Sequence, residues 1–423
     1  MMVWAAPASS ADSFAIAHYD VRLEPDVAGG RVVGVETISV GFADRQGGSV
    51  TLNRGALSID AIEEGGRPLS FETDTGIIRI AVPSARAPLR RITIRYHGSP
   101  TSGLLFVPER EQLYTVFSTS QWMPAIDNPE ARATLRLQLV VPRDWTAAAS
   151  GRQVSRRHVT GASDIIEWRQ ERAVPSYTFG FVAGRFITHT ERAGKVTLRY
   201  LASATAADNI ALVFRESAEM LKFFEDRSGV PYPGTEYAQA LVARTAGQEM
   251  AGLSIVSEEY GRSVAANPMS AGLLAHEFSH QWWGNTVTCR AWTEFWLNEG
   301  FATFMAAAYR EHRFGREVYL QDMASLRERY QQVVDRGHDG PLVFASWARP
   351  TADDRTLVYQ KGALFLHELR ALLGDQRFWL GIRQYTRKHA GQAVTTSDLQ
   401  AAMEEASGRD LRGVFTQWAY PGR

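Results

Sequence analysis

Two histidines and a glutamate lie close together in residues 275–301, A-H-E-F-S-H-Q-W-W-G-N-T-V-T-C-R-A-W-T-E-F-W-L-N-E-G-F. On a helix, His276 and His280 stand four residues apart and project from one face. Two imidazole nitrogens can then reach one small tetrahedral metal ion. Glu277, between them, comes close to the hydrolytic water and can serve as its general base. This spacing indicates the chemistry of a zinc hydrolase.

A catalytic zinc site normally takes three protein ligands and leaves a fourth position for water. The third candidate is Glu299, in the later segment W-L-N-E-G-F, which also has a helical pattern. The motif H-E-x-x-H alone arises by chance often enough to be weak evidence. A further carboxylate in an apolar, Trp-rich segment favours a functional site. We therefore expect one Zn²⁺ ion per chain, held by His276, His280 and Glu299.

The longer run H-E-F-S-H-Q-W-W-G-N-T-V-T, followed by W-T-E-F-W-L-N-E-G-F-A, resembles the zinc signature of the aminopeptidase N family, which includes the leukotriene hydrolases. The resemblance implies an enzyme that removes the N-terminal residue from peptides with a free N-terminus. It also implies a saddle-shaped β domain followed by a thermolysin-like catalytic domain. The sequence stops near the family's usual end of that domain, at a segment containing Phe415, Trp418 and Pro421, which implies a short two-domain member without the C-terminal helical domain.

Two further stretches carry the resemblance. V-Y-Q-K-G matches the family's catalytic-tyrosine segment and places Tyr359 on that tyrosine, whose hydroxyl stabilises the negative charge of the tetrahedral intermediate. G-Q-E-M-A-G aligns through Gly252 with the family's amine-recognition loop and places Glu249 on its glutamate, which binds a free α-ammonium by charge-assisted hydrogen bonds. Gly247, through its backbone, is a weaker candidate for contacting the bound peptide.

The sequence departs from the family pattern in this loop. Gln248 and Met250 replace the usual methionine and asparagine, so the preference for the first substrate residue stays open. The family also supplies a Gln or Glu from the β domain to the amine site. That position falls near Ser118, and the nearest amide belongs to Gln121. The sequence does not decide whether either residue takes the role.

The elements that must position these residues change character along the chain. From about residue 13 to residue 201 apolar and polar residues alternate, as in R-I-T-I-R-Y-H at residues 91–97, which indicates half-buried antiparallel strands. Residues 204–224 have the apolar stripe of one amphipathic helix, and beyond residue 270 nearly all of the pattern is helical. We predict an α+β multidomain protein, with an N-terminal antiparallel β-sandwich over residues 1–202 and a mostly helical zinc peptidase domain over residues 203–423.

Composition excludes several classes of partner. The 423 residues carry 46 basic and 46 acidic side chains, so attraction to nucleic acid or to an anionic membrane is not indicated. No apolar run is long enough to cross a bilayer. The single cysteine, Cys289, cannot form an intramolecular disulfide, and it fits a small buried residue and a cytoplasmic location. The first residues, M-M-V-W-A-A-P-A-S-S-A, could also be the stub of a trimmed export signal. We expect a monomer.

Other aromatic and imidazole side chains are given structural roles. A cluster of tryptophans around the ligand segments is expected to pack in the core, and four histidines lack the spacing of a second metal site. These are Trp282, Trp283, Trp292 and Trp296, and His312, His338, His367 and His389. Two alternative functions remain: an endopeptidase of thermolysin type, and a catalytically silent scaffold that binds peptides.

Overall fold

The computed structural model describes residues 14–42, 47–84, 87, 89–159, 161–245, 247–344, 346–347 and 349–420. The stretch considered as a trimmed export signal lies outside these residues, as does Pro421. Within the described part of the chain, none of the helices has both the length and the apolar character needed to span a lipid bilayer.

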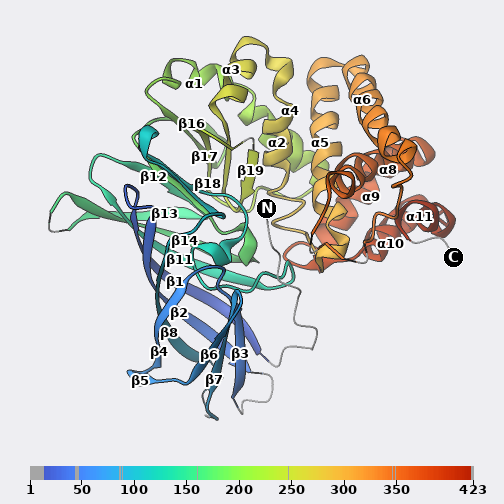
Figure 1. Ribbon diagram of the computed structural model, residues 1–423. Coiled ribbons are helices and arrows are strands. Elements are labelled where there is room, and N and C mark those ends of the chain that lie inside the picture. The colour runs from blue at the N-terminus through green and yellow to red at the C-terminus, as the bar shows by residue number, and fades with distance from the viewer. Residues whose placement is uncertain are drawn as a thin grey trace.

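The N-terminal half is built of β-sheets, which occupy the lower part of Figure 1. An eight-stranded sheet has the order β13-β14-β11-β1-β2-β8-β4-β5, a four-stranded sheet β12-β15-β10-β9, and a three-stranded sheet β3-β7-β6. The strands are β1 Phe14–Asp26, β2 Arg31–Phe42, β3 Gly48–Asn53, β4 Ser58–Glu64, β5 Arg67–Pro68, β6 Phe71–Asp74, β7 Ile77–Val82, β8 Arg90–Gly98, β9 Leu104–Val107, β10 Gln112–Thr115, β11 Arg132–Pro142, β12 Thr146–Ala149, β13 Arg152–His158, β14 Ser163–Pro175 and β15 Phe181–Gly184.

The period-two pattern has the predicted consequence in β8. Ile92, Ile94 and Tyr96 are completely buried, whereas Arg91, just before them, and Arg95, between Ile94 and Tyr96, are exposed. This alternation buries one face of the sheet. One pairing differs from the antiparallel prediction, because β1 and β11 run parallel. The two strands are far apart in the sequence, and a parallel pair needs a long connection of this kind.

A five-stranded sheet of order β16-β17-β18-β20-β19 begins the second half. Its strands are β16 Phe186–Ala193, β17 Val196–Ser203, β18 Glu236–Val242, β19 Gly247–Met250 and β20 Leu253–Ser257. One sheet thus contains strands from both sides of Ser203, and the domain boundary near that residue stays a prediction. Strand β19 lies at the edge of the sheet, where its outer backbone groups have no neighbouring strand among the described residues.

Helices form the rest of the second half, in the upper and right-hand parts of Figure 1. They are α1 Ile210–Val213, α2 Ser217–Ser228, α3 Glu258–Ala266, α4 Gly272–Ser279, α5 Trp296–Phe314, α6 Arg316–Asp335, α7 Ala352–Thr356, the π-helical turn η7 Leu357–Lys361, α8 Gly362–Leu373, α9 Asp375–Lys388, α10 Thr396–Ser407 and α11 Arg412–Ala419. Short strands β21 Thr288–Cys289 and β22 Ala393–Val394 pair in parallel. The prediction of a mostly helical second half is confirmed.

The prediction of one helix over residues 204–224 was wrong. The chain forms α1, breaks, and starts again as α2, which continues to Ser228. Glu216 lies in the break, and its buried carboxylate accepts hydrogen bonds from the Tyr309 hydroxyl and from Nε of Arg313, both at 2.7 Å. These contacts tie the break to α5 across the core, which local periodicity could not indicate.

The two halves of the chain are joined through Arg132 on β11. Its guanidinium donates to the hydroxyl of Thr288 and to the backbone oxygen of Asn285, both at 2.8 Å, and to the backbone oxygen of Ala173 at 3.1 Å. Burial lowers the pKa of Arg132 to about 10. This partly buried cation fixes the segment that follows His280, and we refer to these contacts as the Arg132 clamp.

Candidate active site

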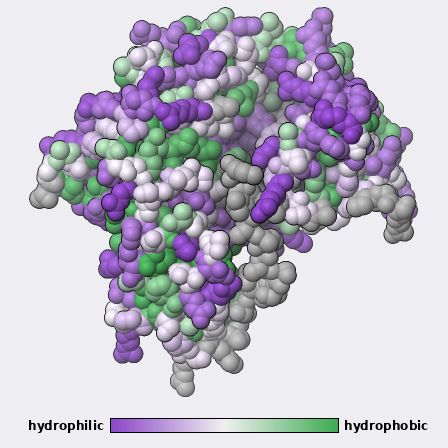
Figure 2. Space-filling model, viewed as in Figure 1, coloured by the Kyte–Doolittle hydropathy of each residue, from purple (hydrophilic) through white to green (hydrophobic). Residues whose placement is uncertain are grey.

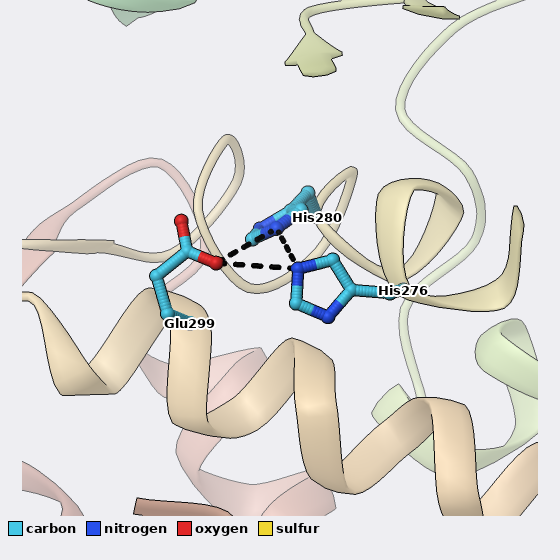
Figure 3. Close-up of side chains that lie close together, drawn as sticks. All are labelled: His276, His280 and Glu299. Carbon is cyan, nitrogen blue, oxygen red and sulfur yellow. Dashed lines mark hydrogen bonds and ion pairs between the residues drawn. The ribbon is translucent and has the colours of Figure 1, made fainter. Parts of the chain in front are cut away.

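The two predicted histidine ligands come from one helix end. His276 lies on α4, and His280 follows the last residue of that helix while keeping helical backbone angles. Glu299 lies in the first turn of α5, which packs against α4. Figure 3 shows the two imidazoles and the carboxylate pointing toward a common point. The structure therefore brings the three predicted ligands together.

The separations between the donor atoms fit a tetrahedral ion. Nε2 of His276 lies 3.2 Å from Nε2 of His280 and 3.2 Å from Oε2 of Glu299. Nε2 of His280 lies 3.5 Å from the same carboxylate oxygen. Bonds of about 2.0 to 2.1 Å to a tetrahedral zinc ion would set neighbouring donors about 3.3 to 3.4 Å apart. The two-nitrogen, one-oxygen donor set is also one that zinc favours.

The surroundings of the three donors support the same interpretation. Nδ1 of His280 is 3.0 Å from the backbone oxygen of Trp283, a contact that leaves Nε2 turned toward the other ligands. Burial would raise the pKa of Glu299, but the nearby His280 and His276 outweigh this and lower it to about 2. Oε1 of Glu299 is buried without a hydrogen-bond partner among the described residues. A cation beside this carboxylate would compensate for its burial.

The predicted general base, Glu277, lies deep in the same site. Its side chain is buried, and a Cβ atom at Gly247 would stand 2.3 Å from its Oε1. The absence of a side chain at Gly247 therefore makes room for the carboxylate. Burial raises the pKa of Glu277 well above its usual range, and the neighbouring Glu249 adds to the shift. Gly247 thus shapes the site through its missing side chain, a contribution that the sequence did not suggest.

Glu249, the predicted amine-binding residue, lies on β19 beside the ligands. One carboxylate oxygen of Glu249, one of Glu277 and one imidazole nitrogen of His280 all lie within 4.8 Å of one another. Burial raises the pKa of Glu249 above its usual value. Gln281 holds the loop from the other side, since its Nε2 donates to the oxygen of Met250 and its Oε1 accepts from the Gly252 N–H, both at 2.9 Å.

Tyr359 lies in the π-helical turn η7, where the chain makes a wider turn than an α-helix does. Its ring is stacked on that of His276, with centroids 6.0 Å apart and planes 7° apart. Burial raises the pKa of the Tyr359 hydroxyl well above its usual value, with a further contribution from Glu299. The phenol therefore stays protonated and can donate a hydrogen bond. Turns of this type are frequent at functional sites.

Several of these side chains line one cavity of about 620 Å³. Its wall includes Glu249, Glu277, Glu299, His276 and Tyr359, and it extends between α4, α5 and α6. Figure 2 shows a recess on this face beside α6, whose outer surface is mostly hydrophilic. The wall also contains residues that no sequence motif indicated: Phe117, Gly272, Leu273, Thr303, Ala306, Ala307, Arg310, Asp322, Ser325, Leu326, Arg329 and Gln360.

The sequence left open whether Ser118 or Gln121 of the β domain contributes to the amine site. Gln121 packs under Gly55 and Gly103, since a Cβ atom at either glycine would stand within 2.6 Å of its side chain. Ser118 follows Phe117 in a turn where both residues have positive φ angles, 44° and 50°. Of these three, Phe117 is the one whose side chain reaches the cavity wall.

Three of the four tryptophans given structural roles lie in the core, as expected. Trp282, Trp283 and Trp296 are fully buried in the helical core, and Cys289 is buried as well. The indole of Trp292 donates to the backbone oxygen of Asp127, in the β half. Within the described ranges, the groups of side chains close enough to share a metal ion are both at the predicted site and include none of His312, His338, His367 and His389.

Comparison with known proteins agrees with the geometry. A family model described as the peptidase family M1 domain matches residues 213–418. Nearly half of the chain is thus similar to this family's domain. Aminopeptidase N of Lactococcus lactis subsp. lactis is 26% identical over 397 residues, covering 87% of this chain and 47% of that protein. Aminopeptidase M1 of Arabidopsis thaliana is 26% identical over 306 residues, covering 70% and 35%. The chain thus spans less than half the length of these M1 relatives.

The fold has close matches among solved structures. The crystal structure of the M1 zinc metallopeptidase from Deinococcus radiodurans superposes with a TM-score of 0.80 at 24% identity, covering 97% of this chain and 94% of that one. A two-domain M1 zinc metallopeptidase mutant bound to L-tryptophan matches equally well, with a TM-score of 0.80 at 23% identity and coverage of 97% and 95%. The predicted α+β, two-domain M1 fold is confirmed.

Proposed function

We propose that this M1 chain is a zinc-dependent aminopeptidase that removes the N-terminal residue from peptides with a free α-amino group. The observation that carries the proposal is that ligand atoms of Glu249, Glu277 and His280 lie within 4.8 Å of one another. Glu249 and Glu277 also line one cavity together with Glu299. Three buried carboxylates in one cavity need compensating positive charge. A divalent ion beside Glu299 and a substrate ammonium beside Glu249 would both supply it.

Each residue has a distinct role in the proposed reaction. His276, His280 and Glu299 would hold one Zn²⁺, which supplies Lewis-acid polarisation of the scissile carbonyl and eases deprotonation of water. Glu277 accepts the proton of the attacking water and delivers it to the departing amine. Tyr359 donates a hydrogen bond to the developing oxyanion. Glu249 binds the α-ammonium, and the free edge of β19 at Gly247 contacts the peptide backbone.

A related structure supports the substrate class. A mutant of the Deinococcus radiodurans M1 zinc metallopeptidase is described as bound to the substrate Tyr-Ser-Ala; it is 24% identical and superposes with a TM-score of 0.78. A cavity of about 620 Å³ offers room for a short peptide. We also retain as proposals a monomeric enzyme, a cytoplasmic location and the domain boundary near Ser203.

Paired substrates test the proposal. Aminoacyl chromogenic substrates, free and N-acetylated, are incubated with the metal-free protein and with the zinc-reloaded protein. We expect turnover only after zinc is restored, and only with free amines. In E249Q, which keeps the size of the side chain but not its charge, kcat/KM for free amines should fall by about 10- to 100-fold, the effect of losing a hydrogen bond to a charged group.

Other outcomes would favour the alternatives. Cleavage of N-acetylated peptides at the rate of free ones would indicate an endopeptidase of thermolysin type. Peptide binding without turnover by zinc-loaded protein would indicate a silent scaffold. E236Q is the matched control, because Glu236 at the start of β18 lies outside the residues that form the cavity wall. This substitution should leave the preference for free amines unchanged.

A further inference from the structure

Gln248 connects Glu249 to a turn of the β half. Its Nε2 donates to Oε2 of Glu249 at 2.6 Å and to the backbone oxygen of Glu249 at 2.9 Å. Its Oε1 accepts a hydrogen bond from the Phe117 N–H at 3.1 Å, across 131 positions of sequence. A single carboxamide thus links the two halves of the chain.

The side chain of Gln248 lies behind the cavity. It is 2% exposed, and the described residues of the cavity wall include Glu249 and Phe117 but not Gln248. Gln248 therefore cannot act by contacting the substrate. Gln248 can affect the reaction only by positioning the Glu249 carboxylate, to which it donates a hydrogen bond.

The turn on the other side of Gln248 has an unfavourable backbone. Phe117 and Ser118 both have positive φ, 44° and 50°, in a region that non-glycine residues seldom adopt. Such a conformation persists when the surrounding structure holds it. The hydrogen bond from the Phe117 N–H to Gln248 is one such restraint, and it keeps the Phe117 side chain at the cavity wall.

Ser118 and Gln121, the two candidates from the sequence and both among the described residues, do not contact the Glu249 carboxylate through a hydrogen bond. Gln121 packs under Gly55 and Gly103, and no hydrogen bond joins its side chain or that of Ser118 to Glu249 in the described part of the chain. The amide that touches Glu249 belongs to Gln248, where the family pattern has a methionine. A charge-assisted hydrogen bond of this length fixes one carboxylate oxygen and leaves the other free to accept from a ligand.

We propose that Gln248 is a positioning residue for amine recognition: it holds the carboxylate of Glu249 in the orientation that receives the substrate's α-ammonium, and it anchors the Phe117 turn beside that position. This inference rests on the proposed aminopeptidase function. It also accounts for the departure from the family pattern at residue 248, because a methionine could not donate to Glu249 and would offer the Phe117 N–H only a weak sulfur acceptor.

Two inhibitors that differ only in the amine test the inference on the zinc-loaded full chain. L-Leucine hydroxamate and 4-methylpentanohydroxamate share the metal-binding group and the side chain, so the ratio of their Ki values isolates the contribution of the ammonium. We expect a large ratio in the parent protein. In Q248M, which keeps an unbranched side chain, the ratio should fall by about tenfold or more. KM for free-amine substrates should rise, with a smaller change in kcat.

The controls separate the inference from the function on which it rests. A parent ratio near one would overturn amine recognition by Glu249, and this inference with it. A large parent ratio that persists in Q248M, with zinc content and Tm unchanged, would overturn the role of Gln248 while the aminopeptidase stands. Q248L repeats the measurement if Q248M does not fold. Q239M, which removes another buried glutamine outside the cavity wall, should leave the ratio unchanged.

Discussion

The ring of Tyr359 lies parallel to that of His276, with 7° between their planes and 6.0 Å between their centroids. The stacking contact places the phenol beside a candidate metal ligand without using its hydroxyl group. Ring and hydroxyl therefore have separable functions, since the ring packs and the hydroxyl remains available as a donor. Phenylalanine at this position would keep the first function and remove the second.

Y359F should lower kcat by about 100- to 1000-fold, the usual effect of removing one oxyanion donor. KM and zinc content should change little, because the ring stays against His276. Steady-state kinetics and metal analysis measure the three quantities. Y385F is the control, since Tyr385 is buried outside the residues of the cavity wall. A kcat within threefold of the parent value would contradict the assignment of the donor.

E277Q should retain one zinc ion per chain and lose about 100- to 10,000-fold in kcat. Its carboxylate is not one of the three proposed ligands, and the loss corresponds to the usual contribution of a general base. Metal content and turnover are measured on the same sample. E294Q, a partly buried glutamate outside the cavity wall, serves as control. Full activity in zinc-loaded E277Q would rule out the proposed base.

G247A should lower kcat by about 100-fold while leaving zinc content unchanged. An alanine Cβ would stand 2.3 Å from Oε1 of Glu277, so the carboxylate must move, and displacements of about 1 Å can have an effect of this size. G413A provides the comparison, because a Cβ atom at Gly413 of α11 meets no atom within 4 Å. Equal activity of G247A and the parent would show that Glu277 works from another position.

Glu36 should make the β half less stable as the pH rises. It is completely buried on β2, and burial raises its pKa well above its usual value of 4.5. The folded state therefore binds a proton that the unfolded state releases above about pH 4.5, and stability falls with rising pH until the folded-state pKa is reached. Between these two pKa values, the free energy of unfolding of E36Q should increase relative to that of the parent by about 1.4 kcal/mol per pH unit.

Urea unfolding of E36Q, E167Q and the parent between about pH 2.5 and pH 8 measures this slope. E167Q is a control of opposite sign. A hydrogen bond from Arg136 lowers the pKa of Glu167 to about 2, so the stabilisation from its charge is present above the unfolded-state pKa and lost as the pH falls toward 2. A parallel pH dependence for E36Q and the parent would mean that Glu36 finds a partner for its charge.

Short-range periodicity predicted the three residues of the candidate metal site more completely than the residues that surround them. The spacing of His276 and His280 is set by one helical turn, and the later helix that carries Glu299 has a clear apolar pattern. The position of Tyr359 followed from the family resemblance, but the π-helical turn that carries it has no local pattern of its own. The proposed ligands could therefore be identified from the sequence, whereas the backbone around the proposed oxyanion donor could not.

Contacts between distant segments explain what the sequence did not predict. The break between α1 and α2 depends on Glu216 meeting Tyr309 and Arg313. The link between Gln248 and Phe117 spans 131 positions. Each contact depends on tertiary packing, and neither residue type nor sequence spacing predicts it. The space that Gly247 leaves for Glu277 belongs to the same class.

The Arg132 clamp bears on whether the two halves can be treated as interchangeable modules. An isolated peptidase domain beginning at residue 203 would lack the guanidinium that binds Asn285 and Thr288, and those acceptors would face water. The segment after His280 would lose its restraint next to a proposed metal ligand. Exchanging β halves between relatives would thus replace part of the scaffold of the metal centre, so the half that carries none of the proposed ligands still helps to determine how firmly they hold the ion.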